Sequence, residues 1–149
     1  MAIRPGSEEY LDSEKYQTRQ WDLTSDASLE PLITKLNRIR QEQPALRHLR
    51  TLQFHDTDSE GLLCFSKTDP MGDGDPILVI VNLNGYEPHS GHVHIDPRTF
   101  DLGLATTTTS SSTTCCGGTY RWRGWHNFVA LDPGRTGYAH VFAVRPTDR

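Results

Sequence analysis

The sequence predicts a mainly β chain, in which an antiparallel β-sandwich follows one amphipathic helix. Three observations predict this fold class. Apolar residues recur with a helical period between residues 29 and 39, short β-type runs follow from residue 49 onward, and turn-forming residues separate those runs at regular spacing. A chain of 149 residues has room for one ordinary domain, or for a small domain and a fragment of another.

The helix is predicted from an apolar stripe with polar residues on the opposite side. Its members are Leu29, Leu32, Ile33, Leu36 and Ile39. Ser28 suits the N-cap, Pro31 falls in the first turn, where a missing N–H costs nothing, and Pro44 ends the helix. We expect the stripe to pack on a core, because propensity alone barely holds a helix of this length.

About seven strands are predicted after the helix. They are Leu49–Phe54, Leu62–Ser66, Ile77–Leu83, Gly91–Ile95, Thr119–Trp122, Asn127–Leu131 and Ala139–Val144. Turn residues at 56–61 and 70–75 predict the connections between the first three. Ile77–Val81 is apolar at every position and is therefore predicted as a central strand. Short strands at this spacing are typical of an antiparallel sandwich.

One segment fits neither the helix nor the strands. From Thr106 to Cys116 the chain consists only of threonine, serine and cysteine. Composition alone favours a flexible loop. Alternatively, a reading frame moved back by one base turns this run into an Asp-rich turn and a plausible strand. We therefore hypothesise a compensated pair of single-base indels around residues 105–117, in which case the sandwich lacks one strand and exposes unpaired sheet edges.

Composition and charge exclude several classes of protein. A net charge of -4 and a pI of about 5.9 argue against nucleic acid as a partner. No apolar run approaches the roughly 20 residues of a membrane helix, and the start lacks the apolar segment of a secretory signal, so we expect a cytoplasmic protein without a membrane partner. Three cysteines are too few for a disulfide scaffold. The length also excludes a complete (β/α)8 barrel of about 250 residues.

Acidic, histidine and cysteine side chains are candidates for catalysis or metal binding. Acidic residues near the start could supply an acid and a base for glycoside chemistry, although a solvated loop is favoured; they are Glu8, Glu9, Asp12 and Glu14. His92 and His94 would share one face of a strand near His89, but exposed histidines on an edge strand, after a turn at Ser90–Gly91, are favoured over a zinc site. We expect no metal and no cofactor. Cys64, in an apolar strand, is predicted to be a buried, inert thiol.

Aromatic side chains gather late in the sequence. Tyr120 and Trp122 share one strand face, whereas Trp125 falls in a turn. Because aromatic rings on a sandwich can stack on sugars, a carbohydrate-binding module is one candidate function, with Trp125 as the glucan contact. Core packing is favoured for Tyr120 and Phe128. Near the start, the neighbours Lys15 and Tyr16 could hold a phosphate or sugar hydroxyls, or could be an ordinary surface pair.

Several strings of sequence together resemble one enzyme family. Pro5–Gln17, Trp21–Asp22, Leu36–Arg40 and Pro44–Leu46 resemble the α-1,4-glucan:maltose-1-phosphate maltosyltransferases, which belong to the α-amylase-type glycoside hydrolase superfamily. The resemblance continues through Val81–Leu83, Tyr120–Trp122, Asn127–Val129 and Leu131–Pro133. It covers nearly the whole chain, but only the C-terminal end of the family proteins. At 106–117 the family instead has a strand of the form Val-x-Asp-Leu-Leu-x-Gly, which favours the frame hypothesis.

The resemblance implies a domain division. Residues 1–47 would be the last loop and helix of a truncated (β/α)8 barrel. Residues 48–149 would be the C-terminal β-sandwich, disturbed at 105–117. The chain would then be a C-terminal fragment, the product of a gene interrupted upstream of Met1.

The resemblance also implies a function. In this family a retaining reaction moves maltosyl from maltose 1-phosphate to the non-reducing end of an α-1,4-glucan and releases phosphate. Lys15 and Tyr16 would contact the donor, and the intact enzyme would be a homodimer. The family's Asp nucleophile and Glu acid/base lie upstream of Met1, so we expect no transferase activity from this chain alone. The alternative is a non-catalytic carbohydrate-binding or structural β-sandwich module.

Overall fold

The computed structural model describes residues 18, 20–26, 28–100, 107–111, 118–122, 124 and 126–146. The chain divides into two compact units, one up to Lys35 and one from Leu36 onward. Helix α1 (Glu30–Glu42) spans the division, and the short 3-10 helix η1 (Pro44–Arg47) follows it. Neither is long and apolar enough to cross a membrane, nor is any other helix of the described residues.

The predicted ends of α1 are confirmed. The Ser28 hydroxyl accepts a hydrogen bond from the Glu30 amide at 3.2 Å, Pro31 lies in the first turn, and the helix ends two residues before Pro44. The predicted packing of its stripe is only partly correct. Ile39 is buried, but the other four members, Leu29, Leu32, Ile33 and Leu36, are exposed. Four of the five stripe residues therefore keep apolar surface exposed.

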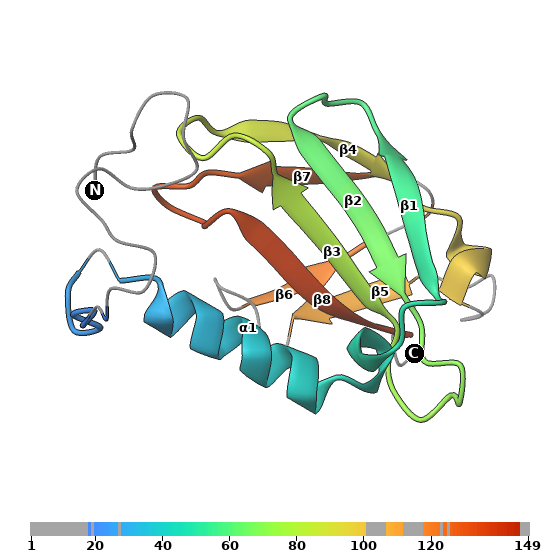
Figure 1. Cartoon of the computed structure of the whole chain (residues 1–149). Helices are drawn as coiled ribbons and strands as arrows, with labels where there is room; N and C mark the ends of the chain where they lie inside the picture. Colours follow the sequence, from blue (N-terminus) through green and yellow to red (C-terminus); the bar gives the residue numbers. More distant parts are fainter. Residues whose placement is uncertain are drawn as a thin grey trace, which may run out of the picture. The chain divides into compact units, whose positions relative to one another are not determined.

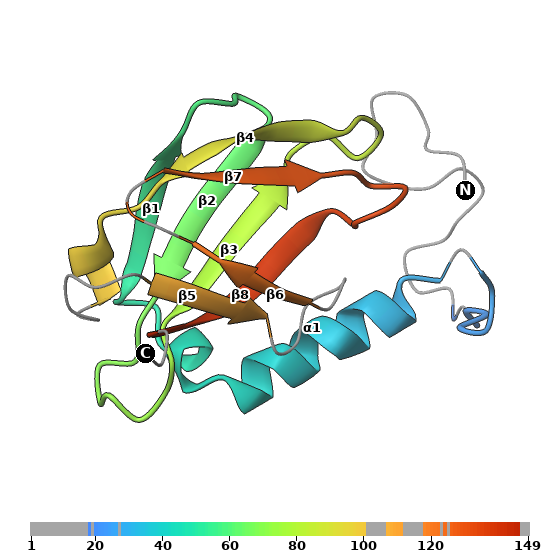
Figure 2. The same ribbon diagram turned by 180° about the vertical axis from the view of Figure 1, so that it is seen from behind.

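Among the residues that the structure describes, the second unit contains eight antiparallel strands, whose arrangement can be followed in Figures 1 and 2. They are β1 (Leu52–Thr57), β2 (Leu62–Lys67), β3 (Ile77–Asn82), β4 (His89–His94), β5 (Thr107–Ser111), β6 (Gly118–Arg121), β7 (His126–Leu131) and β8 (Ala139–Pro146). A second 3-10 helix, η2 (Pro97–Phe100), follows β4. The strand order is β6-β5-β8-β3-β2-β1-β4-β7. This arrangement confirms the predicted antiparallel β class.

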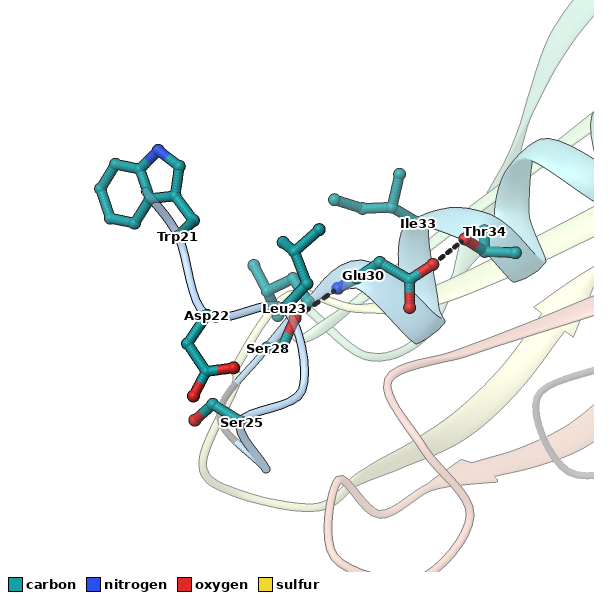
Figure 3. Close-up of a pocket in the computed structure, with 9 residues that line it drawn as sticks. Trp21, Asp22, Leu23, Ser25, Ser28, Glu30, Ile33 and Thr34 are labelled. Atoms are coloured by element: carbon teal, nitrogen blue, oxygen red, sulfur yellow. Dashed lines mark hydrogen bonds between the residues drawn. The ribbon is translucent and has the colours of Figure 1, made fainter. Parts of the chain in front are cut away.

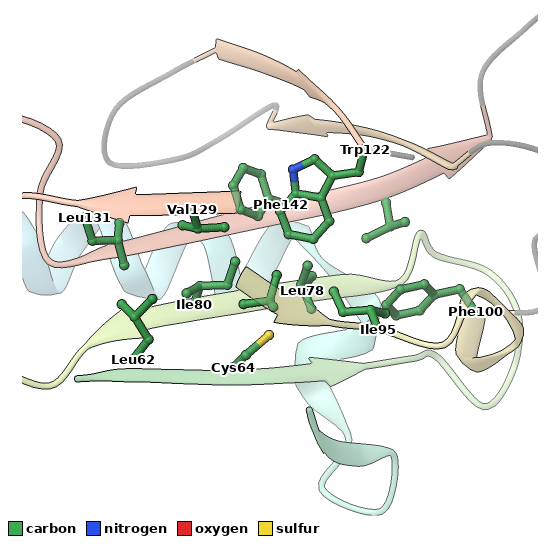
Figure 4. Close-up of a cluster of buried hydrophobic side chains, with 12 residues drawn as sticks. Leu62, Cys64, Leu78, Ile80, Ile95, Phe100, Trp122, Val129, Leu131 and Phe142 are labelled. Atoms are coloured by element: carbon green, nitrogen blue, oxygen red, sulfur yellow. The ribbon is translucent and has the colours of Figure 1, made fainter. Parts of the chain in front are cut away.

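Strand β1 joins two layers. Its first residues, Leu52–His55, pair with β2, whereas Asp56 and Thr57 pair with β4. The sheet therefore turns at β1, and β4 and β7 form a second layer across β2 and β3 (Figures 1 and 2). An inner core fills the space between them (Figure 4). It contains Leu62, Cys64, Leu78, Ile80, Val93, Ile95, Phe100, Trp122, Val129, Leu131, Phe142 and Val144.

Strand β3 is buried on both of its faces. Leu78 and Ile80 point into the inner core, whereas Ile77 and Val79 pack on the other side with Ala45 and Ala143. This second cluster is called the outer core below, and η1 supplies part of its cover through Ala45, which is fully buried. The prediction of a central strand is confirmed, because β3 lies between β2 and β8.

The threonine–serine run is not a gap in the sheet. Thr107–Ser111 form β5, which pairs with β8 on one side and β6 on the other. The expectation of a missing strand at this place is therefore wrong. The hydrogen bonds between strands come from backbone N–H and C=O groups, so they do not require apolar side chains. Threonine, which is β-branched, also favours an extended backbone. The origin of the unusual composition stays a hypothesis about the gene.

Phe142 and Phe128 provide a test of which side of each strand faces the core. Phe142 is 1% exposed and lies 5.6 Å from the Trp122 ring, whereas Phe128 is 59% exposed. We expect Phe142→Ala to lower the free energy of unfolding by about 3–5 kcal/mol, because it leaves a cavity. Phe128→Ala should cost less than about 1 kcal/mol. Urea denaturation followed by circular dichroism measures both, and equal losses would contradict this assignment of faces.

Candidate functional site

The outward side of the second layer carries two rows of side chains, all of them polar except Phe128. Cross-strand partners share a face, and the register places Asp56 opposite His94 and His94 opposite His126. The next row runs from Asp58, just beyond β1, through His92 to Phe128, its partner on β7. These six residues, Asp56, Asp58, His92, His94, His126 and Phe128, are called the histidine face below. They stand outward because Gly91 and Val93, which alternate with the histidines, are buried.

Asp58 is fixed to β4 by a two-point contact. Its Oδ1 accepts a hydrogen bond from the His92 amide at 2.6 Å, and its Oδ2 lies 3.0 Å from His92 Nδ1. These contacts, with smaller attractions from the His92 and His94 rings, hold the pKa of Asp58 below its ordinary value. A carboxyl in this environment is an anion at neutral pH and serves as an acceptor or positioning group. It is unsuited to donate a proton.

Gly91 makes this approach sterically feasible. A Cβ at position 91 would lie 2.4 Å from Asp58 Oδ1 and 2.8 Å from Ser59 Cβ. Any side chain there would push the carboxylate away from β4. Gly91 is therefore part of the site. Its role can be recognised from the sequence only when the pairing of β1 with β4 is known.

The imidazole rings of the face lie close together. The centroids of His94 and His126 are 4.3 Å apart, and His92 lies edge-on to Phe128 at 5.4 Å. In the part of the chain that the structure describes, no group of three or more His, Cys, Asp or Glu side chains is arranged to hold a metal ion. The prediction that His92 and His94 share a face is confirmed.

Three details of the prediction are wrong. Strand β4 is not an edge strand, because it pairs with β1 and β7, and Ser90 and Gly91 lie within it rather than in a turn. Phe128 is exposed instead of packed in the core, since its neighbours Asn127 and Val129 take the inward positions. The register of β7 decides which alternate residues face inward, and composition does not reveal that register.

His140 is the most unusual buried polar group among the described residues. It is 3% exposed, and neither ring nitrogen has a hydrogen-bond partner. The ring instead packs beside Tyr120 at 5.7 Å and Phe142 at 5.3 Å. Burial lowers the pKa of His140, because the charged form would lose its solvation. Cys64 is buried, as predicted, and burial raises the pKa of its thiol to about 12, which disfavours the reactive thiolate.

The first unit contains an apolar hollow of about 550 Å³ (Figure 3). Its apolar lining comes from Trp21, Leu23, Leu29 and Ile33, all of them exposed. Its polar rim is internally bonded: Asp22 accepts from the Thr24 hydroxyl at 2.6 Å, and Thr34 donates to Glu30 at 2.7 Å. The bonds from Thr24 lower the pKa of Asp22. The hollow is thus an apolar surface without a free acid or base.

The predicted binding residues Lys15, Tyr16 and Trp125 lie outside the described residues, as do the acidic residues between Glu8 and Glu14. The structure therefore does not place them. Sequence reasoning in turn missed His126 as a neighbour of His94. The sequence showed only a histidine just before the predicted strand Asn127–Leu131, with no indication of its cross-strand partner.

Comparison with known proteins identifies relatives of this chain. Residues 54–144 match a family model described as "GLGE, C-terminal". An α-1,4-glucan:maltose-1-phosphate maltosyltransferase of Mycolicibacterium smegmatis is 42% identical over 145 residues, covering 94% of this chain and 20% of the relative. Maltosyltransferase 1 of Streptomyces coelicolor is 44% identical over 151 residues, with 97% and 21% covered. An enzyme of the same name from Methylacidiphilum infernorum is 37% identical over 142 residues. The chain spans about a fifth of the length of these relatives.

Because His140 is buried, we expect the free energy of unfolding to fall as the pH is lowered. Its folded pKa lies below the ordinary value of 6.5, so on acidification the unfolded chain binds the proton first and stability falls, by at most about 1.4 kcal/mol per pH unit. His55, also shifted down by burial, adds to the loss. We expect His140→Leu to be at least as stable at pH 7 and to lose less between pH 7 and 5. Urea denaturation at both pH values measures this; parallel curves for the two proteins would contradict it.

Proposed function

This chain belongs to the GLGE C-terminal family, and on that basis we propose that it serves as the C-terminal part of a retaining maltosyltransferase. The reaction would transfer maltosyl from maltose 1-phosphate to the non-reducing end of an α-1,4-glucan and release phosphate. The observation that carries the proposal is the family match over residues 54–144, which runs from β1 into β8 and so includes both layers of the sandwich. The maltosyltransferase names of relatives 37–44% identical to the chain support it.

The first contribution of the chain would be structural. Beyond the outer core, the same side of β1 and β2 leaves Leu52, Phe54 and Leu63 exposed. A contiguous apolar sheet surface of this kind is typical of an interface. The relatives are about five times longer than this chain. We propose that, in a full-length enzyme, the part that lies outside the match covers this apolar surface.

The apolar stripe of α1 supports the same view of the first unit. Leu29, Leu32, Ile33 and Leu36 would pack against the remainder of a (β/α)8 barrel, with residues 1–47 as its tail and 48–149 as the sandwich. The hollow between Trp21 and Ile33 would be filled in the same way. The homodimer of the intact enzyme and its cytoplasmic location belong to this proposal and rest on the family resemblance alone.

The second contribution would be to the substrate sites. By the resemblance, the Lys15 ammonium and the Tyr16 phenol would bind the donor, since both groups donate hydrogen bonds to sugar or phosphate oxygens. Trp125 would stack on the glucan. The Asp nucleophile and the Glu acid/base of the retaining mechanism would come from the part of the enzyme outside the match.

A chimaeric enzyme tests this proposal. The matching C-terminal fifth of the Mycolicibacterium smegmatis relative is replaced by this chain, and phosphate release from maltose 1-phosphate is measured with glycogen as acceptor. We expect activity from the chimaera and none from the 149-residue chain alone. In the chimaera, Lys15→Ala should raise KM for maltose 1-phosphate by about tenfold, equivalent to about 1.4 kcal/mol, whereas the control Lys35→Ala should not. Trp125→Ala should raise KM for glycogen only.

The outcomes separate the parts of the proposal. A folded chimaera that releases no phosphate contradicts the enzymatic role. An unchanged KM in Lys15→Ala removes the donor contact alone. If instead the isolated chain is retarded by glycogen in a native gel and Trp125→Ala abolishes the retardation, the carbohydrate-binding alternative replaces the enzymatic one.

A further inference from the structure

We propose that His94 and His126 form a two-histidine chelate for a divalent transition metal, with Cu²⁺ and Ni²⁺ preferred over Zn²⁺. The two residues are direct partners on β4 and β7, so both rings emerge from the same row of the outward face. His94 is half-buried and His126 is exposed, which leaves the pair accessible to an ion from solvent. This inference is independent of the proposed transfer reaction.

Neither ring of the pair is engaged elsewhere. Among the described residues, no side-chain hydrogen bond involves His94 or His126, whereas the His92 ring contacts Asp58 and the His55 ring contacts Ser66. Neutral imidazoles with a free ring nitrogen are the ligands that divalent transition metals take most readily. Of the described rings, this pair combines free nitrogens, exposure and close approach.

The separation of the rings favours one coordination geometry. With a metal–nitrogen distance of about 2.1 Å and a ring radius of about 1.1 Å, two imidazoles bound at 90° place their centroids about 4.5 Å apart, and at the tetrahedral angle about 5.2 Å apart. The observed separation of 4.3 Å is close to the first value. A right angle between ligands is typical of Cu²⁺ and Ni²⁺, whereas Zn²⁺ prefers the tetrahedral angle.

The surroundings of the pair favour a cation. Asp56 is the register partner of His94 on β1, so a carboxylate stands in the same row as the two rings. Asp58 adds a second negative charge within electrostatic reach of His94. No group of three protein ligands is formed, so water would complete the coordination shell and the ion would exchange readily.

A bound ion would have a structural consequence. Strand β7 is the last strand of the sheet order and pairs only with β4 among the described strands. A metal bridging His94 and His126 would link the two side chains in addition to the backbone ladder. Because the ion binds the folded chain alone, it would raise the midpoint of thermal unfolding.

Calorimetric titration of the full, tag-free chain with CuCl2, NiCl2 and ZnCl2 at pH 7.5 tests the chelate. We expect about one Cu²⁺ or Ni²⁺ per chain and weaker binding of Zn²⁺. His94→Gln and His126→Gln should each weaken Ni²⁺ binding at least about tenfold. The controls His48→Gln and His89→Gln, which remove a histidine elsewhere, should bind as the parent does.

Two results would overturn the proposal. If both His94→Gln and His126→Gln bind Ni²⁺ as the parent does, the pair is not the site. If Zn²⁺ binds more tightly than Ni²⁺ and Cu²⁺, the right-angle geometry is wrong. Should a variant unfold, selective broadening of the His94 and His126 ring proton signals by Cu²⁺ in the parent chain decides instead; broadening confined to other histidines contradicts the chelate.

Discussion

The burial of β3 on both faces is the constraint on which the rest of the fold depends. Four consecutive residues, Ile77–Ile80, are each at most 8% exposed, and fully burying an apolar side chain contributes about 1.5–3 kcal/mol. The backbone of β3 is satisfied by β2 and β8 on its two sides. The side chains on the two faces of β3 must therefore be buried by two separate sets of residues. The layer of β4 and β7 packs on the face that carries Leu78 and Ile80, and η1 packs on part of the other face through Ala45 and Leu46.

This constraint links the fold to the proposed role of the chain. The inner core closes within the chain, whereas the outer side of the same sheet remains partly open at Phe54 and Leu63. A sandwich that is complete on one side and open on the other fits a module within a larger enzyme. The histidine face lies on the outward side of the second layer and adjoins the apolar surface at β1, because Phe54 and Asp56 are two residues apart on one face of that strand.

Local pattern was enough to predict much of the fold. The apolar run of β3, the β-type run of β7 and the prolines around α1 each depend on residues close in sequence, and they indicated the correct elements. Strand β5 could not be predicted in this way. Its threonines and serines carry no apolar alternation, and its ladder depends on β8, more than 30 residues away.

The site depends on pairing between distant strands, which the sequence does not display. His92 and His94 were recognised as sharing a face, but the positions of Asp58 and His126 follow from the registers of β1 and β7. A register shift of one residue would turn His126 inward and Asn127 outward. For the same reason the exposure of Phe128 was misjudged: in a strand with one solvent-facing side, such as β7, every second residue points outward, and only the register says which residues these are.

The free energy of unfolding of Val79→Thr tests the two-sided burial of β3 most directly. Val79 points into the outer core and is 8% exposed. The substitution keeps the shape of the side chain and the β-propensity, but it places a hydroxyl among apolar neighbours. If the outer side is a true core, the variant loses about 1–3 kcal/mol in urea denaturation. A change within about 0.5 kcal/mol, as at a solvent-facing position, would contradict the account.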